Sequence, residues 1–78
     1  MRCEVRPVRL RDGGDHEGAL IMCEDALIAV LSKLGPDHGA LAGRWHVECA
    51  FGPGLEANAN FPDLERACNW FEDALRQR

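Results

Sequence analysis

Apolar and polar residues alternate most regularly between residues 44 and 61, where the chain reads RWHVECAFGPGLEANANF. This is the period of a strand with one buried face. The apolar positions of its first half are Trp45, Val47, Cys49 and Phe51. The GPG stretch at 52–54 is typical of a reverse turn, and alternation resumes after it. Pairing Trp45 with Phe61 and Val47 with Ala59 places the apolar side chains on one face. The pattern therefore predicts a hairpin over 44–61 whose apolar face belongs to the core.

Two other segments have the period of a helix. From about His16 to Leu34, apolar residues recur at alternating spacings of three and four, namely at Leu20, Cys23, Leu27, Val30 and Leu34. Gly35 and Pro36 then supply a C-terminal stop signal. A second helix is predicted after Pro62, with Asp63 as its N-cap and with Leu64, Ala67, Cys68, Phe71, Ala74 and Leu75 on its buried face.

The first predicted helix carries more apolar residues than one core-facing stripe requires. Ile21 and Ile28 form a second apolar strip, with Glu24 between this strip and the main one. A helix that is apolar over most of its circumference usually has a second surface to cover. We therefore expect Ile21, Glu24 and Ile28 to contact a partner protein or a second copy of the chain. Trp70, on the flank of the second helix, fits either packing against a sheet edge or a place in the same interface.

Residues 2–11 read as an N-terminal strand in which the apolar parity changes at Pro7. A proline cannot donate to a strand ladder, so we expect an edge strand with a bulge or break near Arg6 and Pro7. The segment also concentrates positive charge, at Arg2, Arg6, Arg9 and Arg11. These arginines either protect an exposed edge from self-association or form a strip that contacts phosphate or an acidic partner.

The element order is therefore β-α-β-β-α in a single α+β domain spanning residues 1–78. We expect a small three-stranded sheet, made of the central hairpin 44–61 and the N-terminal edge strand, with two helices packed on one face. The other face of the hairpin presents polar side chains, among them Arg44, His46 and Glu48. A domain of this size has a thin stability margin, for which oligomerisation is a common remedy.

Composition limits the choice of partner and compartment. The net charge is −4, which argues against generic binding to nucleic acid or to an anionic membrane. No stretch has the roughly 20 apolar residues of a membrane span, and the N-terminus lacks the apolar centre of a signal peptide. A cytoplasmic protein is therefore the expectation. The evenly spread Cys3, Cys23, Cys49 and Cys68 then read as buried free thiols.

Catalytic and metal-binding signals are weak. The histidines and cysteines show no CxxC or HxxxH spacing, so neither a metal site nor a cofactor is expected. His46 and Glu48 share one strand face and could together transfer a proton, and Asp37-His38 is a polar pair on a loop. A small enzyme or toxin-like nuclease centred on His46, Glu48 and His38 is therefore one alternative. Nucleic-acid binding through the N-terminal arginines is another.

The element order is similar to KH-like and double-stranded-RNA-binding topologies, but the GXXG loop of the former and the basic surface of the latter are missing. Small toxins with a catalytic strand histidine would be matched only by His46. In size, acidity and lack of catalytic motifs, the chain resembles small proteins of phages and mobile elements, including anti-CRISPR inhibitors. This resemblance implies a non-enzymatic module that binds another protein as a regulator or stoichiometric inhibitor, with a homodimer as one form. The expected contact residues are Ile21, Glu24, Ile28, Trp70, Arg44, His46, Glu48, Arg6 and Arg9.

Overall fold

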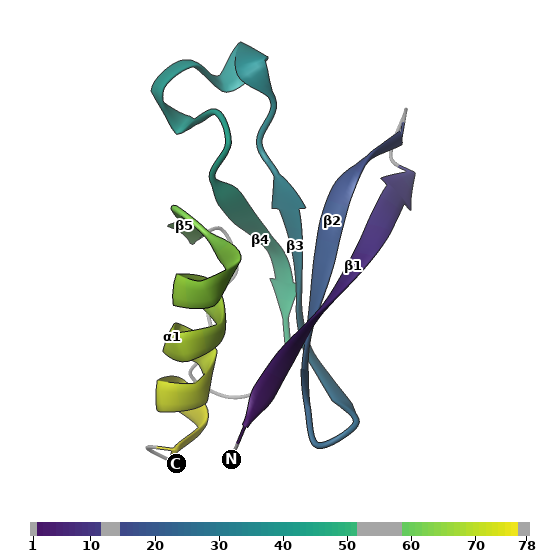
Figure 1. Ribbon diagram of the computed structural model, residues 1–78, viewed down its shortest axis with the longest axis vertical. Helices are drawn as coiled ribbons and strands as arrows, with labels where there is room; N and C mark the ends of the chain where they lie inside the picture. The colour runs from purple at the N-terminus through teal and green to yellow at the C-terminus, as the bar shows by residue number, and fades with distance from the viewer. Residues whose placement is uncertain (1, 12–14, 52–58, 77–78) are drawn as a thin grey trace.

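Within the described part of the chain, five strands form one antiparallel sheet in the order β1-β2-β3-β4-β5, so each strand pairs with its neighbour in sequence (Figure 1). The computed structural model describes residues 2–11, 15–51 and 59–76. Its elements are β1 (Cys3–Arg11), β2 (Asp15–Cys23), β3 (Ala26–Lys33), the 3-10 helix η1 (Pro36–Leu41), β4 (Trp45–Ala50), β5 (Asn60–Phe61) and α1 (Leu64–Arg76). The predicted three-stranded sheet with two helices is therefore wrong, because the first of those helices is a pair of strands.

The segment predicted as the first helix is the β2–β3 hairpin. Cys23 pairs with Ala26, and the two residues between them turn the chain with positive φ, 51° at Glu24 and 68° at Asp25. Such a tight turn usually contains glycine or asparagine, so an acidic pair gave no hairpin signal. Both strands carry apolar residues on both faces. A segment of that composition satisfies the helical period as well as two strands do, which is the physical reason for the error.

Strand β1 lies at the edge of the sheet, as its proline predicted, but it has no bulge. Its register with β2 is continuous from Cys3 opposite Cys23 to Arg11 opposite Asp15. The change of apolar parity has a different cause. Val5 packs against the core under α1, whereas Val8 and Leu10 have the opposite parity and lie on the other face.

The predicted pairing of the 44–61 hairpin is confirmed where the chain is described. Trp45 pairs with Phe61, and the Val47 amide donates to the Ala59 carbonyl at 2.8 Å. The predicted turn at 52–54 and the rest of the second strand up to residue 58 lie outside the described residues. Strand β4 contains an irregularity, because Val47 pairs with Leu31 whereas Cys49 pairs with Val30. The extra residue shifts the parity, so Phe51 is 52% exposed and does not join the core as predicted.

Helix α1 follows the sequence prediction closely. The Arg66 amide donates to Asp63 Oδ1 at 2.8 Å, so Asp63 is the N-cap. Ala67 and Phe71 are fully buried, and they close the core against the sheet. The largest fully buried sheet residues in this core are Ile21, Leu31 and Val47. Trp70 packs on Phe61 of the edge strand, with ring centroids 5.9 Å apart.

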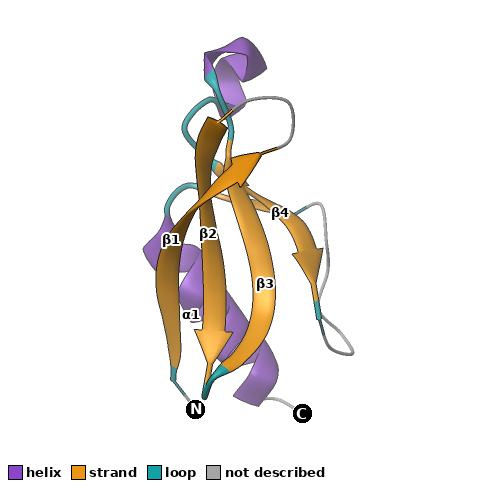
Figure 2. Cartoon of the chain, turned by 90° about the vertical axis from the view of Figure 1, so that its right-hand side faces the viewer, coloured by secondary structure: helices purple, strands orange, loops and turns teal. Residues whose placement is uncertain are grey.

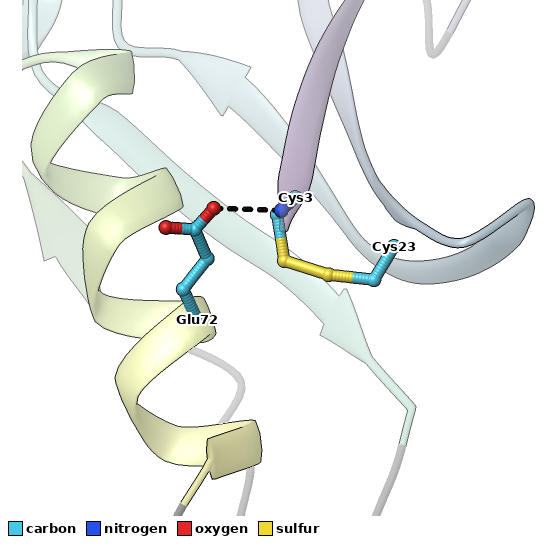
Figure 3. The surroundings of a disulfide bond; sticks show 3 residues. All are labelled: Cys3, Cys23 and Glu72. Atoms are coloured by element: carbon cyan, nitrogen blue, oxygen red, sulfur yellow. Dashed lines mark hydrogen bonds between the residues drawn. A yellow bond between two sulfur atoms is a disulfide. The ribbon is translucent and has the colours of Figure 1, made fainter. Parts of the chain in front are cut away.

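A disulfide joins Cys3 of β1 to Cys23 of β2, which corrects the prediction that all four cysteines are free (Figure 3). The two residues lie directly opposite each other, with Cα atoms 4.3 Å apart. Such a short separation is typical of a non-hydrogen-bonded pair, for which about 4.5 Å is usual. The Cys3 amide therefore points away from β2, and it donates to Glu72 Oε2 of α1 at 2.7 Å. The disulfide therefore joins β1 to β2, and the hydrogen bond joins β1 to α1.

Candidate functional site

Helix α1 leaves much of the sheet uncovered. Figure 1 shows β1, β2 and β3 continuing past the level at which α1 begins. Figure 2 shows these strands in front of α1, with their other face turned towards the viewer. Two surfaces are therefore available for binding. One is the helix-side face beyond the start of α1, and the other is the face opposite α1, here called the open face.

A row of charged and aromatic residues crosses the helix-side face just beyond the helix. Arg9 pairs with Glu17 between β1 and β2, and Lys33 pairs with Trp45 between β3 and β4. Lys33 Nζ lies 3.3 Å from Glu17 Oε2, which joins the two halves of the row. The next row towards the helix contains Ala19, Leu31 and Val47, which are fully buried. The charged row is therefore the first row of the sheet that α1 does not cover.

An open groove of about 570 Å³ follows this row. It is lined by Pro7, Val8, Arg9, Glu17, Gly18, Trp45 and Leu64. A second hollow of about 520 Å³ is lined by Glu17, Lys33, Leu34, Gly35, Pro36, Ala42 and Gly43. Because Glu17 lines both, we treat them as one surface, the helix-side groove. Its ends are mainly apolar and its centre holds three charged side chains.

The loop that forms one end of the groove is held by backbone hydrogen bonds. The Leu34 amide donates to the Arg44 carbonyl, and the Gly43 amide donates to the Leu34 carbonyl, both at 2.8 Å. Gly43 has a φ of 84°, a left-handed conformation that glycine adopts without steric cost. This wall of the groove is therefore pre-formed.

The open face has an apolar row and a polar row. Register and alternation place Arg6, Leu20, Val30 and Cys49 in the first row, and Val8, Gly18, Ser32, His46 and Asn60 in the second. Leu10 folds over Gly18, because a β-carbon on Gly18 would lie 2.5 Å from Leu10 Cγ. At the β4 side, Arg44 Nε donates to Asn60 Oδ1 at 2.5 Å. The predicted polar face of the 44–61 hairpin thus belongs to a larger surface across the sheet.

The geometry around His46 does not form a nucleophile relay. His46 lies opposite Ser32, but the Ser32 hydroxyl donates directly to Glu48 Oε2 and is not bonded through the imidazole. Ser32 is also only 3% exposed, so its hydroxyl is shielded from a substrate. His38 lies in η1, where its Nε2 is 3.9 Å from Asp37 Oδ1. The residues predicted for a small enzyme are therefore spread over β4 and η1.

The two cysteines outside the disulfide, Cys49 and Cys68, are half-buried. Burial raises the pKa of the Cys68 thiol, and the nearby Glu72 carboxylate raises it further. A raised pKa keeps the thiol protonated and lowers its nucleophilicity at neutral pH.

In the described part of the chain, no three residues among His, Cys, Asp and Glu are grouped as a metal site requires.

The structure separates the predicted contact residues. Ile21 is 0% exposed and Ile28 is 9% exposed, so both belong to the core and the predicted second apolar surface of a helix does not exist. Glu24 lies at the exposed β2–β3 turn, and Trp70, 37% exposed, is on α1. The others divide by strand and face: Arg44, His46 and Glu48 lie in or beside β4, with Arg6 on the open face and Arg9 on the helix side.

The four N-terminal arginines do not form one strip. Arg2 lies just before β1, and strand alternation places Arg6 on the open face but Arg9 and Arg11 on the helix side. A nucleic-acid strand that contacts all four side chains through its phosphates would have to wrap around the edge of the sheet. This division weakens the alternative of a nucleic-acid-binding regulator.

Of the residues that line the groove, the sequence predicted Arg9 as a contact residue and missed the others, among them Glu17, Lys33, Trp45 and Leu64. The predicted helix placed Glu17 and Lys33 at its opposite ends, and Trp45 was assigned to the core alone. The available signal was Lys33, the single lysine of the chain, which follows an apolar run in the same way as Glu17 precedes one. Only the strand register brings the two side chains together.

Among the described residues, no helix has the length and apolar character needed to span a membrane. Comparison of the chain with protein-family models, with curated proteins and with solved structures finds no match.

Proposed function

We propose that the protein is a non-enzymatic protein-binding module that acts as a regulator or stoichiometric inhibitor of another protein, and that the helix-side groove receives an extended segment of that partner. The observation that supports this proposal is the row from Arg9 to Trp45, which lies uncovered beyond the start of α1. A groove with a pre-formed wall limits the entropy lost on binding.

The chemistry of the groove indicates what the segment contains. Trp45, Leu64 and Pro7 offer apolar surface for an aromatic or aliphatic side chain. Arg9 and Lys33 stand on either side of Glu17, so two cationic side chains and one anionic side chain meet at the centre, within a chain of net charge −4. An acidic residue in the partner would gain electrostatically there. We therefore propose a partner segment in which an acidic residue lies near an aromatic or a large aliphatic residue.

Selection of a phage-displayed random peptide library on the immobilised protein tests this proposal. Enriched peptides are expected to combine Asp or Glu with an aromatic or large aliphatic residue. Lys33→Glu should weaken their binding at least tenfold, because it replaces an attractive charge by a repulsive one in a partly desolvated groove. The Lys33 side chain is 44% exposed, so its replacement should leave the fold intact. Fluorescence anisotropy of a labelled peptide measures the change.

Arg76→Glu is the matched control. It makes the same charge reversal on a side chain that is 65% exposed at the far end of α1. Its dissociation constant should stay within about twofold of the wild-type value, since exposed charges more than about 10 Å apart are largely screened at physiological salt. Equal loss in both variants, or enrichment of no peptide, would contradict a groove-specific site.

A further inference from the structure

The open face has an apolar centre that no described element covers. Leu20 and Val30 face each other across β2 and β3, and both are only half-buried. Met22 and Val8 are also half-buried on this side. The solvent face of an antiparallel sheet usually alternates to polar residues, so an apolar centre of this kind indicates a covering surface.

The charges beside this centre have opposite signs. Arg6 is at the β1 end of the apolar row. Its side chain is 55% exposed and forms an exposed ion pair with Glu4, with Arg6 Nη2 lying 3.4 Å from Glu4 Oε1. Glu48 is on β4, and the hydrogen bond that it accepts from Ser32 holds its exposed carboxylate on the open face. The row therefore has a cation at one end, two aliphatic residues in the middle and an anion beside the other end.

We propose that a second copy of this chain covers the open face, with a two-fold axis parallel to the strands between Leu20 and Val30. This axis places Leu20 of each copy over Val30 of the other. The same operation brings Arg6 onto the β4 end of the facing row, beside Glu48. Isologous packing repeats each contact, so two Arg6–Glu48 pairs would flank one apolar centre. Aligned packing of two sheets has this form.

Among the described residues, the sheet edges are poorly suited to dimerisation by strand pairing. Pro7 lies in the set of β1 residues whose backbone faces away from β2, and it has no N–H to donate to an added strand. In the same set, the Cys3 amide is already bound to Glu72. At the opposite edge, β5 contains only two residues. Face-to-face packing avoids both edges.

The surface area that each copy would bury in a dimer is a moderate share of the exposed surface of this chain. A standard interface buries about 800 Å² per partner. The whole chain exposes 5101 Å², so one face would have to contribute about a sixth of this surface. The proposed dimer also leaves both helix-side grooves on the outside. It is independent of the proposed function, because the row of Arg6, Leu20 and Val30 and the row from Arg9 to Trp45 lie on opposite sides of the sheet.

Sedimentation velocity over a concentration series tests the dimer. The wild-type protein is expected to sediment as a dimer at micromolar concentration. Val30→Glu should sediment as a monomer at 100-fold higher concentration, with an unchanged circular dichroism spectrum as the control for folding. Arg6→Glu and Glu48→Arg should each raise the dimer dissociation constant at least tenfold. Combining them should return it to within about threefold of the wild-type value.

The exchange of charge between Arg6 and Glu48 tests the dimer even if Val30→Glu does not fold. Arg76→Glu, a reversal of the same kind on α1, should leave the dissociation constant unchanged. A wild-type monomer throughout the series would overturn the proposal. A dimer that persists in Val30→Glu would also overturn it. Failure of the double variant to regain affinity would overturn the Arg6–Glu48 pairing and with it the proposed axis.

Discussion

Phe71→Ala is expected to remove about 3–5 kcal/mol, a large share of the protein's free energy of unfolding, at 25 °C. Phe71 is fully buried between α1 and the sheet, and its ring centroid lies 6.2 Å from that of Phe61 and 5.1 Å from that of Trp70. Removing a buried phenylalanine side chain costs about 3–5 kcal/mol in free energy of unfolding, because apolar burial is lost and a cavity remains. At about 0.05–0.15 kcal/mol per residue, a domain of 78 residues has only about 4–12 kcal/mol in total.

Urea denaturation followed by circular dichroism measures this loss. Phe71→Leu keeps most of the volume and should lose less than half as much stability as Phe71→Ala. Trp70→Ala removes a larger ring, but that residue is 37% exposed, so it should also cost less than Phe71→Ala. A loss below about 1 kcal/mol for Phe71→Ala would contradict a core that depends on α1.

Reduction of the Cys3–Cys23 disulfide is expected to lower the free energy of unfolding by about 3 kcal/mol. The bond closes a sequence separation of 20 residues. In the chain-entropy description, a loop of this length restricts the unfolded chain by about 3 kcal/mol. For a domain of this size the melting temperature should fall by roughly 12–24 °C. Thermal melts of the wild-type protein with and without dithiothreitol measure the effect.

The double variant Cys3→Ala/Cys23→Ala is the control. It should melt near the reduced wild type and should not respond to dithiothreitol, because Cys49 and Cys68 are free. Identical melting of the oxidised and reduced wild-type protein would contradict a stabilising bond. The expectation of a cytoplasmic location, drawn from the sequence, bears on this bond. A reducing compartment would keep the pair as thiols, and the protein would then function at the lower stability.

Local sequence signals were sufficient to predict α1 and the described part of the 44–61 hairpin. Asp63 caps α1, and the spacing of Ala67 and Phe71 places both on its buried face. In the hairpin, the shared parity of Trp45 and Phe61 defined the register. In each case the residues that decide the structure are close in sequence, or follow one period without competition from another. Pro7 likewise identified an edge strand through a property of its own backbone.

The same reasoning failed where two structures satisfy one pattern. Residues 16–34 bury apolar side chains equally well as one helix or as two strands with both faces partly covered. The hairpin turns at Glu24 and Asp25, whose residue types do not by themselves indicate a turn. Their left-handed conformation accompanies the pairing of β2 with β3. The disulfide was missed for the same reason. Cys3 and Cys23 become neighbours only once β1 pairs with β2.

By itself, the sequence determined which segments are apolar enough to leave water, where α1 begins, and how Trp45 pairs with Phe61. Tertiary structure alone decided which side chains share a surface. Arg9, Glu17, Lys33 and Trp45 belong to four strands, and they form one row only through the register of three ladders. The physical reason is that periodicity records the preference of each side chain for water or core, whereas register depends on backbone hydrogen bonds between segments distant in sequence.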